Sequence, residues 1–312
     1  MKIVFMGTPD FAVSTFKAIV DGGHEVVAAV TQPDKPKGRG MELIPSPVKA
    51  YALSENIPVY QPEKIKGNSE FEETLRELAP DVCVVVAYGK ILPKSILDIP
   101  RLGCVNVHAS ILPKYRGSAP IQWCIVNGDT VSGVTTMLMD EGMDTGDILD
   151  IATINIPDTM TGGELHDKLA LLGAEIINTT LASLENNTAC PKMQDESEAT
   201  YVRMLSKADG RVDFTKTAKE VADHIRGFDP WPSAFTFFDG KMYKLFRPTV
   251  GAETKCQPGT LVSADANGAV FACGDGKTVI VDAIQVAGSK KMIVSQYLNG
   301  HKLPVGSVAD NE

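Results

Sequence analysis

Apolar residues at the start of the chain follow two spacings that together predict a strand, a helix and a second strand. Lys2 to Met6 is a short apolar run that Gly7 closes, as is typical of a buried strand. Positions 11, 15 and 19 then repeat at helical spacing, and Glu25 to Thr31 is a second run rich in β-branched residues. A β-α-β unit requires its two strands to be parallel. The pattern therefore predicts an α/β fold built on a parallel sheet.

The same alternation of strands and helices continues through the first 186 residues. Asp81 to Tyr88 is apolar almost throughout, as a central parallel strand buried on both faces should be. A long amphipathic helix begins near Thr161, where Glu164 three residues later completes a capping box. The pattern also predicts helices over 48–55, 69–78 and 119–126, and strands over 59–60, over 134–139 and up to residue 156.

The character of the chain changes after this helix. Residues 187–206 are polar and predict a linker over the surface. A helix over 218–226 and short strands separated by Gly, Pro and Asp turns then favour a small β-barrel. We expect a doubly wound α/β domain over 1–189, a linker over 190–206 and a barrel domain over 207–312.

One strand carries a pair of side chains suited to carbonyl chemistry. Successive side chains of a strand point to opposite faces, so Asn106 and His108 share one face. Pro113 ends regular pairing soon afterwards, which places the pair at a carboxyl end, where open α/β sheets bind ligands. An amide can donate to a developing oxyanion and an imidazole can pass a proton. A hydrogen-bonded structural histidine is the alternative for His108.

An acidic turn, DEGMDTGD at positions 140–147, follows the strand predicted over 134–139. Its spacing does not fit a calcium loop. The turn can be a solvated surface feature, or Asp144 can reach across to His108 from the neighbouring strand end. In the second case the carboxylate would orient the imidazole and stabilise its protonated form.

The sequence lacks the motifs of several common classes of enzyme. The turn after the first strand reads G-T-P-D-F, without the glycines of a dinucleotide site, and the chain has no phosphate-binding G-x-x-x-x-G-K-[ST] loop. Ser110 stands near His108 but not in a G-x-S-x-G elbow. These absences leave direct acyl transfer to an amine as the reaction that best fits Asn106, His108 and Asp144.

Composition indicates an ordinary globular protein with an uneven charge. The 312 residues are 44% hydrophobic and 22% charged, which suits two packed domains. The net charge of −9 taken alone argues against a nucleic-acid partner. However, residues 201–312 carry 14 Lys and Arg against 12 Asp and Glu, so the excess of acid belongs to the first 200 residues. The last third of the chain is the better candidate to meet a polyanion.

The six cysteines show neither a C-x-x-C pair nor a histidine at metal-ligand spacing. We expect reduced cysteines and no metal site. No run approaches the roughly 20 apolar residues that span a bilayer, and the first residues do not resemble a signal peptide. We therefore expect a cytoplasmic protein.

A long proline-rich loop, Gln32 to Pro47, concentrates positive charge at Lys35, Lys37 and Arg39. Loops of this length in compact domains are usually functional or disordered. It can be a solvated connector, but the clustering of the charges favours an arm that contacts an anion.

Two longer motifs resemble the folate-dependent formyltransferases. They are NVHASILPKYRG, which begins at residue 106, and GVTTMLMDEGMDTGD, which begins at residue 133. The segments QPDKPKGRG, AYGKILP, LSKADGRVDF and FDPWPSA resemble the branch of that family that acts on methionyl-tRNA. This resemblance implies a Rossmann-like formyltransferase domain followed by an OB-like barrel that helps to hold tRNA.

The resemblance also implies roles for single residues. Asn106, His108 and Asp144 match the catalytic residues of the family, and Arg39 with its neighbours Lys35 and Lys37 matches the loop that enters the acceptor arm of tRNA. The segment that would contact folate consists of Ser110, Ile111, Leu112 and Pro113.

The reaction that the resemblance implies is formyl transfer from 10-formyltetrahydrofolate to the α-amino group of methionine on initiator Met-tRNA, by a monomer without a metal. One alternative is a formyltransferase for a small amine, such as glycinamide ribonucleotide or an amino sugar nucleotide. The long basic loop and the barrel count against it. Another is a non-catalytic RNA-binding protein on the same fold, against which the intact N-x-H and D-x-G motifs count.

Overall fold

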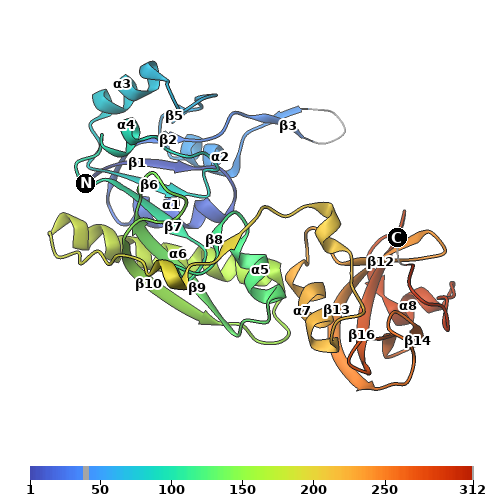
Figure 1. Ribbon diagram of the computed structural model, residues 1–312. Coiled ribbons are helices and arrows are strands. Elements are labelled where there is room, and N and C mark those ends of the chain that lie inside the picture. The colour runs from blue at the N-terminus through green and yellow to red at the C-terminus, as the bar shows by residue number, and fades with distance from the viewer. Residues whose placement is uncertain (38–41, 311–312) are drawn as a thin grey trace. The chain divides into compact units, whose positions relative to one another are not determined.

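The computed structural model describes residues 1–37 and 42–310 (Figure 1). By the contacts between its residues the chain divides into two compact units. The first comprises Met1–Gly117, Gly133–Ile154 and His166–Tyr201, and the second comprises Ser118–Ser132, Asn155–Leu165 and Val202–Glu312. The domain limits expected from the sequence stay a prediction.

The first unit is built on a seven-stranded sheet with the strand order β10-β9-β7-β6-β1-β2-β5. Adjacent strands in the part of the sheet from β5 to β7 pair in parallel, as predicted. β9 joins β7 antiparallel, which the sequence pattern did not reveal. The strands are β1 (Lys2–Gly7), β2 (Glu25–Val30), β5 (Val59–Tyr60), β6 (Val82–Val86), β7 (Cys104–His108), β9 (Val131–Leu138) and β10 (Ile148–Asn155).

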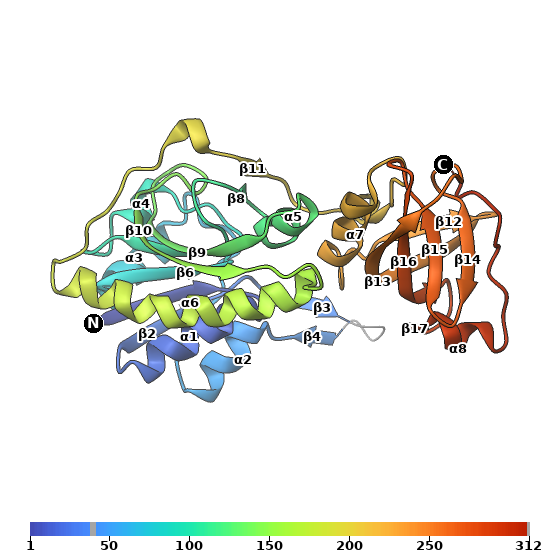
Figure 2. The same cartoon turned by 90° about the horizontal axis from the view of Figure 1, so that it is seen from below.

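Helices cover both faces of this sheet, so the doubly wound fold is confirmed (Figure 2). On one face, Phe71 of α3 and Ile96 of α4 share a buried cluster with Met6 of β1. On the other face, Phe16 of α1 stacks on Phe5 of β1 with ring centroids 4.3 Å apart. The helices are α1 (Phe11–Asp21), α2 (Pro47–Ser54), α3 (Ser69–Leu78), α4 (Lys94–Leu97) and α6 (Gly162–Glu185).

The long helix α6 begins where its capping box predicts. The Thr161 N–H donates to Glu164 Oε2 at 2.8 Å, and the Glu164 N–H donates to Thr161 Oγ1 at 3.2 Å. This reciprocal pair satisfies two backbone donors that the first helical turn leaves open.

The loop from Gln32 to Pro47 contains a hairpin that the sequence pattern did not reveal. β3 (Lys35–Lys37) pairs antiparallel with β4 (Glu42–Ile44), and the arm extends away from the sheet of the first unit (Figure 1). The pattern did not reveal this hairpin because the pairing depends on the backbone. Two extended segments satisfy each other's N–H and C=O groups whatever side chains they carry. Arg39 and the side chain of Lys37 lie outside the described residues.

The second unit is rich in β-structure, as predicted. Its antiparallel sheet has the order β12-β13-β16-β15-β14, with β17 on β16, and it encloses a buried cluster that includes Ile225, Leu245 and Val281. Its strands are β12 (Phe235–Phe238), β13 (Lys241–Glu253), β14 (Leu261–Asp265), β15 (Gly268–Ala272), β16 (Lys277–Val286) and β17 (Met292–Ile293), and its helices are α5 (Pro120–Val126), α7 (Ala218–Gly227) and α8 (Val294–Leu298).

The segment predicted as a surface linker is partly built into the first unit. β11 (Tyr201–Val202) pairs with β8 (Arg116–Gly117), and Gln194 is buried with 4% exposure. Short 3₁₀ helices occupy Glu196–Glu198 and Lys207–Gly210. Of residues 187–206, only Gln194 and Leu205 are buried, so the segment lies mostly at the surface, and Gln194 is its polar side chain that bonds inside the protein.

The six cysteines are free thiols. None of the helices in residues 1–37 and 42–310 combines the length and apolar character that crossing a membrane requires. Within the same residues, no group of three or more His, Cys, Asp and Glu side chains is arranged to hold a metal ion.

Candidate active site

The candidate site lies at the carboxyl end of β7, between β6 and β9. His108 is the last residue of β7 and is 7% exposed, and Asn106 two residues earlier is half-buried. In the ladder with β9, Asn106 stands opposite Met137 and His108 opposite Thr135. Strand pairing on both sides therefore fixes the backbone from which the two polar side chains project.

Asp144 lies beside both side chains. His108 Nδ1 is 3.6 Å from Asp144 Oδ2, and Asn106 Nδ2 donates to Asp144 Oδ1 at 3.4 Å. The N–H of Gly117 donates to Asp144 Oδ2 at 2.8 Å. The structure thus brings the three predicted residues together, and their catalytic roles stay predictions.

Three residues at this edge of the sheet adopt the left-handed backbone conformation. Ala87 just after β6, Tyr115 beyond β7 and Asp144 beyond β9 have φ of 46°, 60° and 56°. Such values are uncommon for residues other than glycine and cluster at functional sites. At Gly146, a Cβ atom would stand 1.7 Å from the carbonyl oxygen of Leu138, so only glycine lets the Asp144 loop close onto β9.

The second ring nitrogen of His108 faces a backbone carbonyl. His108 Nε2 lies 3.0 Å from the oxygen of Tyr115. A carbonyl oxygen can only accept, so we assign a proton to Nε2 in this contact. The other ring nitrogen, Nδ1, faces the carboxylate of Asp144 across 3.6 Å.

The segment from Ser110 to Pro113 forms a tight turn just after β7. Thr135 Oγ1 accepts from the N–H of Leu112 at 3.1 Å and donates to the oxygen of Ser110 at 2.7 Å. Ser110 Oγ is buried and donates to the oxygen of Lys114 at 2.7 Å. Ile111 and Pro113 are partly exposed, whereas Leu112 is buried. Ile111 and Pro113 are therefore the members of this segment that a ligand can touch without displacing a hydrogen bond.

The predicted anion-binding residues cannot all be located. Lys35 begins β3 and is exposed. Because Arg39 and the side chain of Lys37 lie outside the described residues, the proposed cluster of charge on the arm stays a prediction.

Two buried polar residues near the site were not singled out from the sequence. Arg116 is fully buried, and Gln194 lies 78 residues away in the chain, yet Arg116 Nε and Nη2 donate to Gln194 Oε1 at 3.1 and 2.9 Å. The carboxylate of Glu196 raises the pKa of Arg116, and the guanidinium lowers the pKa of Glu196. A polar residue beside a turn gives no local signal of such burial, so only the tertiary structure identifies this pair.

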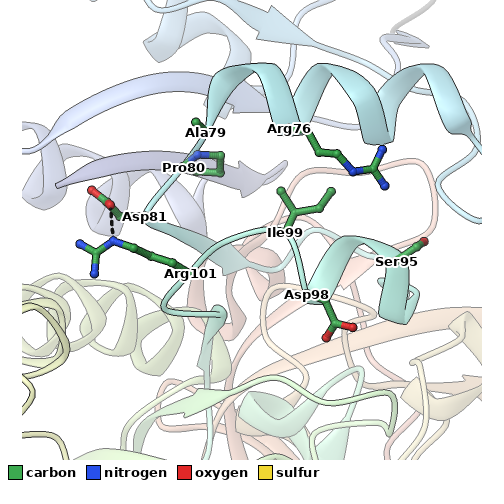
Figure 3. A pocket seen from close by; sticks show the side chains of 8 residues that line it. All are labelled: Arg76, Ala79, Pro80, Asp81, Ser95, Asp98, Ile99 and Arg101. Carbon is green, nitrogen blue, oxygen red and sulfur yellow. Dashed lines mark hydrogen bonds and ion pairs between the residues drawn. The ribbon is translucent and has the colours of Figure 1, made fainter.

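A pocket of about 540 Å³ lies elsewhere in the first unit, at the opposite end of β6 (Figure 3). Asp81, which precedes β6, bonds Arg101 Nε at 2.7 Å, and Arg76 bonds Glu73 at 3.1 Å. Both guanidinium groups at this pocket are therefore already paired. Amino ends of parallel strands are also not where such sheets place ligands. We do not assign this pocket to the site.

Family comparisons match nearly the whole chain. The model described as "Formyl transferase" matches residues 1–181, and the one described as "Formyl transferase, C-terminal domain" matches residues 204–302. A methionyl-tRNA formyltransferase of Acetivibrio thermocellus is 50% identical over 310 residues, covering 99% of each chain. A methionyl-tRNA formyltransferase of Lachnospira eligens is 49% identical, covering 98% of each chain.

Solved structures show a related fold. The N-formyltransferase of Helicobacter canadensis, in complex with folinic acid and dTDP-3-aminofucose, has a TM-score of 0.69 at 20% identity and covers 90% of this chain and 98% of its own. HypX of Aquifex aeolicus, in complex with tetrahydrofolic acid, has a TM-score of 0.65 at 17% identity and covers 98% of this chain and 48% of its own. At these identities the likeness concerns the fold alone.

Proposed function

The chain belongs to the formyl transferase family, and we propose that it transfers the formyl group of 10-formyltetrahydrofolate to the α-amino group of methionine on initiator tRNA. The observation that carries this proposal is 50% identity, over 99% of both chains, to a protein named methionyl-tRNA formyltransferase. A folate co-substrate also agrees with structural neighbours that hold folates.

The reaction proceeds by direct attack. The neutral amine nitrogen bonds to the formyl carbon, whose oxygen gains charge in a tetrahedral intermediate. The bond between the formyl carbon and its folate nitrogen then breaks, the leaving nitrogen takes up a proton, and the amine loses one, so that atoms and charge balance. No covalent enzyme intermediate is required.

Three residues divide this work. Asn106, half-buried at the strand end, donates its amide N–H to the developing oxyanion. His108 takes the proton of the amine and delivers it to the leaving nitrogen. Asp144, 3.6 Å from Nδ1, orients the ring and stabilises the imidazolium.

The folate lies against the turn of Ser110 to Pro113. The partly exposed side chains of Ile111 and Pro113 offer apolar surface, which suits an aromatic ring system. Ser110 and Leu112 support the turn from inside, because both are buried.

The charged tRNA meets the arm of Lys35, Lys37 and Arg39 and the lysine and arginine side chains of residues 201–312. Phosphates supply most of the affinity of nucleic acid for proteins, and lysine and arginine neutralise them. The chain acts as a cytoplasmic monomer in this proposal. A small amine is the weaker candidate substrate, since the relatives named for amino sugars are only about 20% identical.

Purified protein incubated with 10-formyltetrahydrofolate and charged initiator tRNA tests the proposal. Formylmethionyl-tRNA should form, whereas free methionine and an amino sugar nucleotide at the same concentration should stay unmodified. Formylation of the sugar nucleotide in preference to tRNA would mean that the substrate is a small amine. Binding of tRNA without turnover would mean that the protein is not an enzyme.

A further inference from the structure

The segment Gln194 to Tyr201 reaches the candidate site from outside its sequence motifs. Gln194 is 4% exposed, and its Nε2 donates to the backbone oxygen of Asp144 at 2.9 Å and to that of Gly146 at 2.7 Å. Both carbonyls belong to the turn that carries the Asp144 carboxylate. One side chain thus fixes the turn at two points, on either side of residue 145.

Arg116 determines which end of the Gln194 amide faces this turn. Two of its nitrogens donate to Gln194 Oε1, so the NH₂ group must point at the carbonyls of Asp144 and Gly146. The buried guanidinium is in turn satisfied by Glu196, at 2.9 and 2.7 Å, and by the hydroxyl of Tyr201 at 2.7 Å. A buried charge with every partner in place is rigid, because releasing any one partner leaves an unpaired group.

The same segment fixes the opposite side of the histidine. Thr200 Oγ1 accepts from the N–H of Tyr115 at 2.8 Å, and the oxygen of Thr200 accepts from the N–H of Arg116 at 2.8 Å. Tyr115 is left-handed, and its oxygen is the partner of His108 Nε2. Both ring nitrogens of His108 therefore face groups whose backbone this segment holds.

We infer that Gln194 is a positioning residue for formyl transfer, which acts by holding the Asp144 turn in its left-handed conformation beside His108. The inference rests on the function proposed above. Among the described residues, the hydrogen-bond partners of the Gln194 side chain are backbone carbonyls of the turn, the sulfur of Met137 and the guanidinium of Arg116, so its effect on His108 passes through the turn of Asp144. An aspartate adopts this conformation more readily than most residues but still at a cost, which the two hydrogen bonds offset.

A double-mutant cycle separates this role from a merely structural one. Gln194→Ala should lower kcat about 10- to 100-fold, as expected when a reacting group is misplaced by about 1 Å, with KM for folate and for charged tRNA unchanged. In the Asp144→Ala background, the same substitution should cost no further kcat. Equal fractional losses in both backgrounds, a rise in KM at constant kcat, or wild-type turnover in Gln194→Ala would each overturn the inference.

Matched variants keep this test decisive. Asp195→Asn changes the exposed neighbour, whose side chain accepts from the N–H and the hydroxyl of Ser197, and should leave kcat unchanged because asparagine keeps that acceptor oxygen. If Gln194→Ala fails to fold, Gln194→Glu retains the volume, removes the donors to the two carbonyls and should show the same loss of kcat.

A second measurement does not depend on activity. The N–H of Gly117, which donates to Asp144 Oδ2, should exchange its hydrogen faster in Gln194→Ala than in the wild type. Unchanged exchange would contradict the inference. A wild-type protein that does not formylate Met-tRNA would overturn the proposed function instead, and the exchange of Gly117 would still test the positioning role.

Discussion

Each of the two units buries an arginine among polar partners, and the two arginines serve different ends. Arg116 in the first unit is fully buried, and Gln194 connects it to the turn that carries Asp144. Arg226 in the second unit is 2% exposed, and it bonds Asp223 and the backbone oxygen of Met160. The first network ends on the backbone of the turn that carries a carboxylate beside an imidazole, whereas the second ends on a helix and a loop.

The contrast shows how to distinguish a functional network from one that supports the fold. Burial and bonding are alike in both, because an unpaired buried charge is costly anywhere. What differs is the last member of each network. Left-handed backbone and a half-buried amide, Asn106, surround the end of the Arg116 network, and these are features of a site that holds reacting groups.

The largest expected effect falls on catalysis in the first unit. His108→Ala should lower kcat about 10²- to 10⁴-fold through loss of the acid and base, and Asn106→Ala about 10²- to 10³-fold through loss of the oxyanion donor. Steady-state formylation of charged tRNA, with circular dichroism to confirm folding, measures both. Turnover near the wild type in either variant would remove that residue from the mechanism.

The corresponding change in the second unit should affect stability. Asp223→Ala leaves the guanidinium of Arg226 buried without its carboxylate and should lower the free energy of unfolding by about 3–5 kcal/mol. Asp223→Asn keeps the shape and one acceptor oxygen, so its loss should be smaller. Urea unfolding monitored by tryptophan fluorescence suits the test, because both tryptophans, Trp123 and Trp231, belong to this unit. Equal stability of all three proteins would mean that the Arg226 network does not support the fold.

Acid should weaken the second unit through His224. Burial lowers the pKa of this histidine below its usual 6.5, and its Nε2 has no hydrogen-bond partner among the described residues. The unfolded chain therefore binds a proton more readily than the folded one, so stability is full above pH 6.5 and falls as the pH drops below it. Burial also lowers the pKa of His24. Comparing the wild type with His224→Gln therefore separates the contribution of His224 from that of His24. A pH dependence unchanged in the variant would exclude His224 as the cause.

The smallest expected effect concerns the arm of the first unit. Lys35→Ala should raise KM for charged tRNA moderately, leave kcat unchanged and reduce the slope of log KM against log salt by about 1, as loss of one phosphate contact does. Lys94→Ala, which removes an exposed lysine from α4, is the matched control and should change neither quantity. A salt slope equal to that of the wild type would remove Lys35 from the tRNA interface.

Local pattern was sufficient for most of the framework. The strand at Val59–Tyr60 and the helix at Ser69–Leu78 were predicted with the bounds that the structure shows, and Thr161 caps its helix as expected. Period-two alternation placed Asn106 and His108 on one side of a strand before any contact was known. Each of these features depends on neighbours within about four residues, which the sequence displays directly.

Other features depend on partners that are distant in the chain. The antiparallel addition of β9, the pairing of β3 with β4 and the burial of Gln194 have no signature in composition or period. Residues 187–206 were expected to lie over the surface, and most of them do, but the polarity of Gln194 serves another purpose, because its amide donates to carbonyls 48 and 50 residues away.

The sequence by itself placed an amide and an imidazole on one face at a strand end of an α/β sheet and offered Asp144 as a possible partner, because strand periodicity and turn chemistry are local. Only the tertiary structure decided how these groups are held. The angle of the Asp144 turn, the proton on His108 Nε2 and the role of Arg116 depend on hydrogen bonds between segments that meet when the chain folds. A local sequence pattern does not show which distant segments will form these hydrogen bonds. The bonds become favourable only when folding buries and pairs groups that lie far apart in the unfolded chain.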